Sequence, residues 1–200
     1  MQYGVGKDGK IDFPALRKLA VEHQPKLIIA GNTAYPFELD FASFARIADE
    51  VGAYLLADIS HITGLVIAGV HQSPVPYADV IVSTTHKTFR GPRGAIIMAT
   101  NKGLAKDSQL TTKLQKAVFP GLQGGPHNAT TAAIAIAASE ASTPAFKRYG
   151  KNIQKNAAAL ALALQQAGLS LVGGGTQTHL LIIDFSNLAV GIGEIGRAHV

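Results

Sequence analysis

The sequence predicts an α/β domain in which a mostly parallel sheet is flanked by helices. Four short segments are apolar at nearly every position, as are strands that are buried on both faces of a parallel sheet. Segments with helical spacing of apolar residues lie between and after them, which is the alternation expected of helices packed on such a sheet. The pattern leaves open whether one strand returns in the opposite direction. The four segments are 26–30 (KLIIA), 53–57 (AYLLA), 78–83 (ADVIVS) and 95–99 (AIIMA).

Start and stop signals mark the helices. Asp12, two residues before a proline, is typical of a helix start, because its carboxylate caps the first turn and proline fits there. Gly52 ends the second helix. Thr143 separates two later helices, because the residue before a proline disfavours helical backbone. The expected helices span residues 13–23, 41–51, 102–117, 127–141 and 144–167.

We expect the chain to contain parts of two domains. Residues 1–136 form the central part of a larger domain, and residues 137–193 begin a smaller C-terminal α/β domain with strands at 169–172 and 179–185. The glycine run at 173–175 is interpreted as a loop. His71 and His127 have no evident partner and are expected on the surface or in loops.

Composition narrows the classes of function. Of 200 residues, 47% are hydrophobic and 16% charged, as in a globular protein, and the net charge of +5 is scattered. That scatter argues against a nucleic-acid surface. The chain has no cysteine, which excludes disulfides and thiolate metal sites. It also has no signal-peptide pattern and no apolar run of membrane-spanning length, so we expect a cytoplasmic protein without a membrane partner.

Three polar segments directly follow predicted strands: 31–35 (GNTAY), 58–61 (DISH) and 83–87 (STTHK). Ligands of open α/β sheets bind at the carboxyl ends of the strands. The three segments are therefore expected to meet at one edge of the sheet and to form the site.

Lys87 is the most unusual residue of these segments, because a lysine at the end of a buried strand usually has a functional role or a partner that pairs with its charge. Its amine can form a Schiff base with an aldehyde cofactor. Asp58 can hold the ring nitrogen of such a cofactor protonated, so that the ring withdraws electrons. A surface lysine is the plain alternative for Lys87. A metal site made of Asp58, His61 and His86 is disfavoured beside this lysine, and no metal is expected.

Three motifs in this order resemble serine hydroxymethyltransferases, a family of pyridoxal-phosphate enzymes of fold type I. Residues 83–94 (STTHKTFRGPRG) resemble the family's cofactor-lysine segment. Residues 58–65 (DISHITGL) resemble its aspartate-x-x-histidine segment, and residues 118–126 (VFPGLQGGP) resemble its glycine-rich loop. The resemblance runs from about residue 3 to residue 184.

The resemblance implies a role for each matching residue. Lys87 would bind pyridoxal 5'-phosphate as a Schiff base, Asp58 would pair with the pyridine nitrogen, and His61 would lie near the phenolic oxygen. Thr33 stands where the family usually has serine, which keeps the hydroxyl. The implied catalytic residues are Lys87, Asp58, His61 and His86, and the implied cofactor-binding residues are these four with Thr33, Thr84, Arg93, Gly124 and Gly125.

The implied reaction is the reversible conversion of serine and tetrahydrofolate to glycine and 5,10-methylenetetrahydrofolate. The implied assembly is a homodimer or larger homo-oligomer, because the family's glycine-rich loop reaches the cofactor of the neighbouring subunit. Two alternatives stay open: another fold-type I enzyme, such as a threonine aldolase or an aminotransferase, or a non-catalytic fragment.

Both ends of the chain depart from a complete family member. The arginine that clamps the substrate carboxylate has no counterpart here, and neither do the general-base glutamate and the ring-stacking histidine, so we expect this chain alone to be inactive. Met1 matches an interior position of the family. Residues 194–200 (EIGRAHV) depart from the family and resemble a translated sequencing adapter, so they are expected to be a non-native tail.

Overall fold

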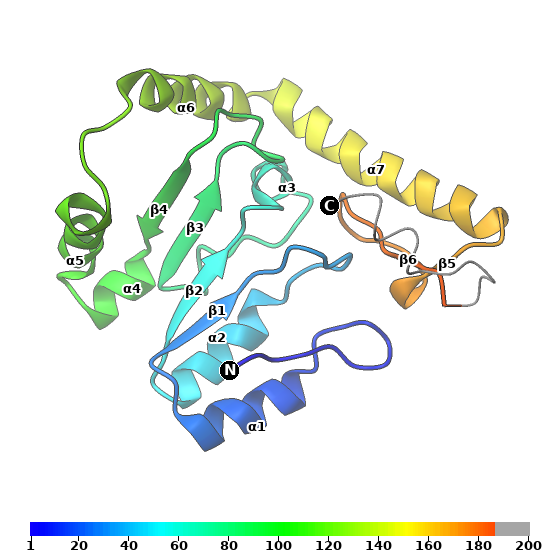
Figure 1. The fold of residues 1–200 in the computed structure, drawn as a ribbon, viewed down its shortest axis with the longest axis horizontal. Helices are drawn as coiled ribbons and strands as arrows, with labels where there is room; N and C mark the ends of the chain where they lie inside the picture. The colour runs from blue at the N-terminus through cyan, green and yellow to red at the C-terminus, as the bar shows by residue number, and fades with distance from the viewer. Residues whose placement is uncertain (187–200) are drawn as a thin grey trace.

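Four strands form the central sheet, in the order β1-β2-β3-β4 (Figure 1). They are β1 (Leu27–Ala30), β2 (Tyr54–Asp58), β3 (Val80–Thr84) and β4 (Ala95–Ala99). The first three run parallel, whereas β4 pairs antiparallel with β3. The structure is a computed structural model that describes residues 1–186. All four strands begin and end within two residues of the predicted segments, and the mostly parallel α/β sheet is confirmed.

Side-chain caps explain where several helices begin. Asp12 accepts a hydrogen bond from the Ala15 amide (2.9 Å) at the start of α1 (Phe13–His23). Thr143 does the same for the Phe146 amide (3.3 Å) at the start of α7 (Pro144–Gln166). Each cap satisfies an amide that has no partner within the helix. The remaining helices of this part of the chain are α2 (Phe41–Glu50), α3 (Thr63–Ala68), α4 (Asn101–Lys106), α5 (Leu110–Lys116), η1 (Ala117–Leu122) and α6 (Asn128–Ala141).

The prediction of one helix over 102–117 is wrong, because the chain breaks between α4 and α5. Asp107 has extended backbone (φ −148°), and its carboxylate accepts a hydrogen bond from the Gln109 amide (3.0 Å). Aspartate competes in this way for backbone donors that a helix would otherwise use.

The C-terminal strands are shorter than predicted. They are β5 (Ser170–Leu171) and β6 (Ile183–Asp184), which pair antiparallel and flank η2 (Val172–Gly174). Residues 179–182 lie outside β6, because the chain just before them bonds to another loop: the Gln177 amide donates to the Pro36 carbonyl (2.8 Å). The predicted loop at 173–175 lies between the two strands. The predicted division near residue 137 falls inside α6, and the tail predicted at 194–200 lies outside the described residues.

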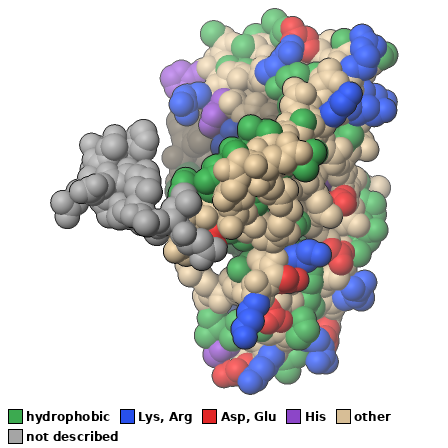
Figure 2. Space-filling model, turned by 90° about the vertical axis from the view of Figure 1, so that its right-hand side faces the viewer, with side chains coloured by type: hydrophobic (Ala, Val, Ile, Leu, Met, Phe, Trp, Pro, Cys, Tyr) green, Lys and Arg blue, Asp and Glu red, His purple; other side chains and the backbone are tan. Residues whose placement is uncertain are grey.

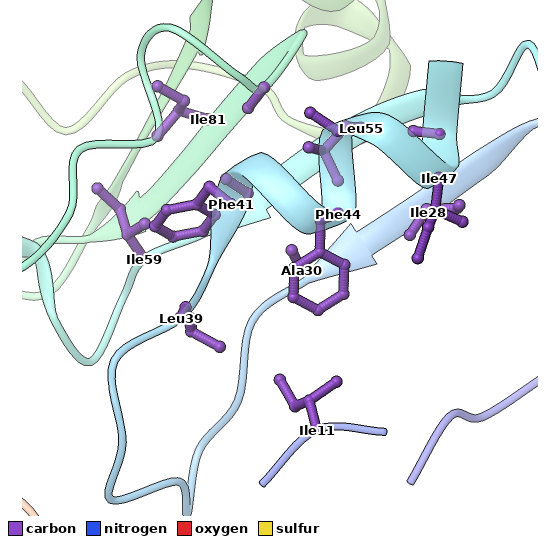
Figure 3. Close-up of a cluster of buried hydrophobic side chains, with 14 of the residues drawn as sticks. Ile11, Ile28, Ala30, Leu39, Phe41, Phe44, Ile47, Leu55, Ile59 and Ile81 are labelled. Carbon is purple, nitrogen blue, oxygen red and sulfur yellow. The ribbon is translucent and has the colours of Figure 1, made fainter. Parts of the chain in front are cut away.

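The core lies between α2 and one face of the sheet (Figure 3). Phe41 and Phe44 of α2 have no exposed surface, and neither does Leu55 of β2. Burying a side chain of this size stabilises the fold by about 1.5–3 kcal/mol. This packing fixes the direction of β1 and β2, and with it the edge at which both strands end.

The opposite face of the sheet is only partly covered by the described residues. Leu27 and Ile29 alternate with the buried residues of β1 and retain 45% and 51% of their exposure. Ile97 and Met98 of β4 are also exposed. The prediction of strands buried on both faces is therefore wrong for β1 and β4. An apolar run shows that a strand can be buried on both faces, but it does not show what covers each face.

Helix α3 was not predicted from the sequence, and it packs closely against α7. A Cβ at Gly150 of α7 would overlap the methyl group of Ala68, and it would lie 3.4 Å from the Gly64 carbonyl oxygen. The absence of a side chain at position 150 is therefore what permits this close contact.

His71 lies in a loop, which is one of the two expected places, but the expectation that it has no partner is wrong. His71 is buried, and its Nε2 accepts a hydrogen bond from the Leu39 amide (3.1 Å). The ring must then be neutral, with Nδ1–H donating to the Gln72 carbonyl (3.0 Å). Burial lowers the pKa of His71, while the bond to Gln72 and the charge of Glu38 oppose that shift. His71 thus holds the loop before α2 to the loop after α3.

Charged side chains of both signs are interspersed on the face drawn in Figure 2, where Lys and Arg do not form one continuous patch. None of the helices within residues 1–186 combines the length and apolar character that crossing a bilayer requires.

The core packing predicts a large loss of stability for Leu55→Ala. Leu55 has no exposed surface, so the truncation leaves a cavity and should lower the free energy of unfolding by about 2–5 kcal/mol. Leu160→Ala on α7, where the side chain is 52% exposed, is the matched control and should change it by less than about 0.5 kcal/mol. Urea unfolding measures both, and equal losses would contradict the assignment of the core.

The His71 contact predicts a pH dependence of stability. The pKa of His71 is lowered in the folded chain, so the folded state binds fewer protons there than the unfolded state. Stability is then complete above the unfolded-state pKa of about 6.5 and falls as the pH decreases below it. In His71→Gln, an amide oxygen that does not titrate can accept the bond from Leu39. The urea midpoint of this variant should fall less between pH 7.5 and 5.5 than that of the unchanged chain, and an equal fall would count against the contact.

Candidate active site

The carboxyl ends of the parallel strands place the three predicted polar segments at one edge of the sheet. Asp58 is the last residue of β2 and pairs in register with Val82 of β3, so Thr84 ends β3 at the same edge. The segment that begins at Gly31 follows β1 there. A Cβ at Gly31 would lie 2.5 Å from the Asp58 carbonyl oxygen, so only glycine allows this approach. The predicted meeting of the three segments is confirmed.

Lys87 lies beside His61 at this edge. Its Nζ is 2.9 Å from His61 Nε2, a hydrogen bond in which the ammonium donates to the neutral ring. Burial lowers the pKa of His61, the charge of Lys87 lowers it further, and the carboxylate of Asp58 opposes both effects. A neutral His61 leaves Nε2 free to accept this hydrogen bond from Lys87.

Thr33, Asp58 and His61 line one narrow cavity of about 10 Å³. This is about the space of one water molecule, so side chains must rearrange before a ring can enter. The Asp58 carboxylate is held in place, because its Oδ1 accepts from the Ser60 amide (3.0 Å). A carboxylic acid, an imidazole and a threonine thus line the same cavity.

Hydroxyl groups hold the segment after β2 to the segment after β3. Ser60 Oγ accepts from the Thr84 amide (2.9 Å). Thr88 Oγ1 donates to the His61 carbonyl (2.8 Å) and accepts from the Gly64 amide (3.0 Å). A side chain at Gly64 would collide with the Thr88 carbonyl, so this position needs glycine. These bonds set the distance between His61 and Lys87, and sequence reasoning gave none of these three residues a role.

The turn after Lys87 is also anchored to the later helices. Arg90 has left-handed backbone (φ 70°), which is uncommon for a residue other than glycine. Its amide donates to the Lys87 carbonyl (2.9 Å). Its guanidinium lies 5.0 Å from the Tyr149 ring and 3.4 Å from Glu140. The Lys87 turn is therefore attached to both α6 and α7.

Thr84 and His86 lie on the same edge but do not line the cavity. Within residues 1–186, the buried atoms Thr84 Oγ1 and His86 Nδ1 have no hydrogen-bond partner. Unpaired buried polar atoms cost free energy, and a ligand that hydrogen-bonds to them would remove that cost. With the lysine and the aspartate, these atoms fit a pyridoxal-phosphate group, whose oxygens and ring nitrogen need such partners.

Arg93, Gly124 and Gly125 are not brought to the cavity. Arg93 is exposed, and the two glycines lie in the exposed connection between η1 and α6. A Cβ at either glycine would meet nothing within 4 Å. Nothing within residues 1–186 therefore requires glycine at these two positions.

His179 lines the cavity although sequence reasoning gave it no role. Its ring lies nearly parallel to that of His61, with 6.2 Å between centroids and 20° between planes. It was predicted only as the first residue of a strand, and no local pattern links it to His61, which is 118 positions earlier.

No three His, Cys, Asp or Glu side chains within residues 1–186 gather closely enough to hold a metal ion. The grouping of Asp58, His61 and His86 as metal ligands therefore finds no support in the described part of the chain.

The Lys87–His61 pair predicts the effect of Lys87→Met on the neighbouring ring. The substitution removes the charge that lowers the pKa of His61 but keeps an unbranched side chain. The pKa of His61 should rise toward its ordinary value, since burial then acts without the lysine. NMR titration of ring-labelled histidine measures this, with Lys113→Met, on exposed α5, as the matched control. An unchanged His61 titration would show that the amine and the ring do not interact.

The sequence is similar to known proteins over nearly its whole length. The sequence model of a family described as "Serine hydroxymethyltransferase" matches residues 1–197. A protein of that name from Sorangium cellulosum is 58% identical over 185 residues, which is 92% of this chain and 42% of that protein. Another, from Acidothermus cellulolyticus, is 54% identical over 199 residues, covering 99% of this chain and 45% of the relative.

A third relative of the same name, from Desulfotalea psychrophila, is 52% identical over 187 residues, covering 94% of this chain and 42% of the relative. The chain thus spans less than half the length of these curated relatives. Because the family match covers nearly all of it, the chain belongs to the serine hydroxymethyltransferase family.

Proposed function

We propose that the whole protein transfers the hydroxymethyl carbon of serine to tetrahydrofolate, reversibly giving glycine and 5,10-methylenetetrahydrofolate. The observation that carries this proposal is the Lys87–His61 pair at 2.9 Å, with Asp58 on the wall of the adjoining cavity. Membership in the family and three relatives that carry its name support the same reaction.

Lys87 is the residue that we propose to bind pyridoxal phosphate. Its amine must lose a proton before it can attack an aldehyde carbon. His61 Nε2 is within hydrogen-bond distance, and the lowered pKa of His61 keeps this atom able to accept. His61 therefore orients the Lys87 amine through this hydrogen bond.

Asp58 is proposed to hold a proton on the cofactor's ring nitrogen. The cofactor, when bound, supplies an electron-withdrawing ring that stabilises negative charge on the substrate carbon. The bond from the Ser60 amide fixes one carboxylate oxygen, so the other oxygen stays available to the ring. Thr33, on the same cavity wall, would offer its hydroxyl near the phenolic oxygen.

Thr84 and His86 are proposed to bind the cofactor through the two buried atoms that lack partners within residues 1–186. Arg93 is proposed to balance charge at the site. Gly124 and Gly125 are proposed to serve the cofactor of a neighbouring subunit, which their exposure and open surroundings support. The assembly would then be a homodimer or a larger homo-oligomer, and the protein would act in the cytoplasm.

The other fold-type I activities, threonine aldolase and aminotransferase, have less support. Identities of 52–58% to proteins named serine hydroxymethyltransferase favour the hydroxymethyl transfer. An assay of a full-length protein that contains this chain tests the choice: formation of glycine from serine should depend on tetrahydrofolate. Equal rates with and without the folate would contradict the proposal.

The role of Lys87 predicts a covalent adduct that depends on one side chain. Adding pyridoxal phosphate to the chain should give a protein-bound absorption band, and borohydride reduction should leave the cofactor's mass on the peptide that contains Lys87. Lys87→Ala should lose both signals, whereas Lys102→Ala, on α4, should keep them. A reduced adduct on another lysine would show that the assignment is wrong.

A further inference from the structure

The side chain of His61 has few partners to hold it. Within residues 1–186, it makes one hydrogen bond, to Lys87, and one ring contact, with His179. The bond from Thr88 reaches the backbone carbonyl of His61 and so does not fix the ring. The orientation of the imidazole therefore depends on Lys87 and His179.

The first of these two contacts is lost when Lys87 acts. Condensation of the Lys87 amine with an aldehyde would release one water and leave the nitrogen with at most one hydrogen instead of the three of an ammonium, so the present bond from the ammonium to His61 would not persist. After that step, the ring of His179 is the remaining contact of the two. The loss of the contact with Lys87 rests on the proposed function, whereas the ring contact with His179 does not.

His179 is well placed to hold a ring in position, because its own segment is anchored. The Gln177 amide donates to the Pro36 carbonyl (2.8 Å), and the Gln177 side-chain oxygen accepts from the Glu38 amide (3.0 Å). Thr178 is fully buried, and its hydroxyl lies 3.4 Å from the same Pro36 carbonyl. The loop that lines the cavity and the segment of His179 are therefore held together by hydrogen bonds.

His179 Nδ1 is buried and has no hydrogen-bond partner within residues 1–186. A buried polar atom without a partner costs free energy, which a phenylalanine of similar shape would avoid. Burial lowers the pKa of His179, and the neighbouring His61 and His71 lower it further, so the ring is neutral beside His61.

We propose that His179 is a positioning residue of this active site, which holds the His61 ring in place once Lys87 has left it. The role needs a flat ring at 6.2 Å from His61, on a segment that is tied to the cavity wall. The site therefore contains a residue from the C-terminal part of the chain as well as the three strand ends.

Removing Lys87 imitates its departure without any cofactor, so the proposal can be tested on the 200-residue chain alone. Four variants form a cycle with the unchanged chain: Lys87→Met, His179→Ala, the double variant, and Lys87→Met with His179→Phe. NMR relaxation of the ring-labelled His61 side chain reports its order parameter in each. His23→Ala at the exposed end of α1 is the matched control for losing a histidine.

The expected result is non-additive. Each single variant should leave the His61 ring as ordered as it is in the unchanged chain, because one contact remains. The double variant should lower the order parameter of the ring into the flexible range, below about 0.6. The variant with Lys87→Met and His179→Phe should stay ordered, since phenylalanine keeps the flat ring.

Two results would overturn the proposal: an ordered His61 ring in the double variant, or a phenylalanine variant as mobile as the alanine one. The first would show that other groups hold the ring, and the second that its flat face is not what matters. Glycine formation that does not depend on tetrahydrofolate, in a full-length protein that contains this chain, would instead refute the proposed function. The relaxation measurement on the 200-residue chain does not depend on that assay, so the two failures are distinguishable.

Discussion

The parallel pairing of β2 with β3 is the constraint on which the site depends. It brings Asp58 and Thr84 to one edge of the sheet, and the bond from the Thr84 amide to Ser60 ties the following segments together. A shift of one residue in this register would turn the side chains of one strand to the other face. The buried packing of α2 against β1 and β2 makes such a shift costly, so the apolar core also protects the geometry of the polar edge.

Much of this arrangement could be predicted from the sequence, because its signals are local. Asp12 and Thr143 cap helices through bonds to residues three positions later, and such pairs are visible in the sequence. The order of strands and polar segments likewise places Asp58 and Lys87 near one another. The break at Asp107 was missed because an aspartate in a helical pattern can either stay within the helix or end it by accepting a bond from a nearby backbone amide. The spacing of the apolar residues does not show which of the two occurs.

The residues that sequence reasoning missed depend on contacts between distant segments. His71 is buried where it accepts a hydrogen bond from the Leu39 amide. No local sequence pattern links these two residues, which are 32 positions apart. His179 reaches the cavity because Gln177 and Thr178 bond to Pro36 and Glu38, a pairing that no periodicity encodes. The burial of each strand face could not be derived either, since the exposed Ile29 and the buried Ile28 belong to the same apolar run.

The bare backbone at Gly150 has a consequence for engineering this protein. Helix α3 is enclosed between α7, which touches it at Gly150, and the Lys87 turn, whose Thr88 touches it at Gly64. An added methyl group on α7 would therefore press a six-residue helix toward the turn that carries Lys87. Substitutions at residue 150, which has no side chain of its own, would thus shift the position of the Lys87 amine through α3. A library that varies this residue would sample small displacements of Lys87 while leaving every polar side chain of the site unchanged.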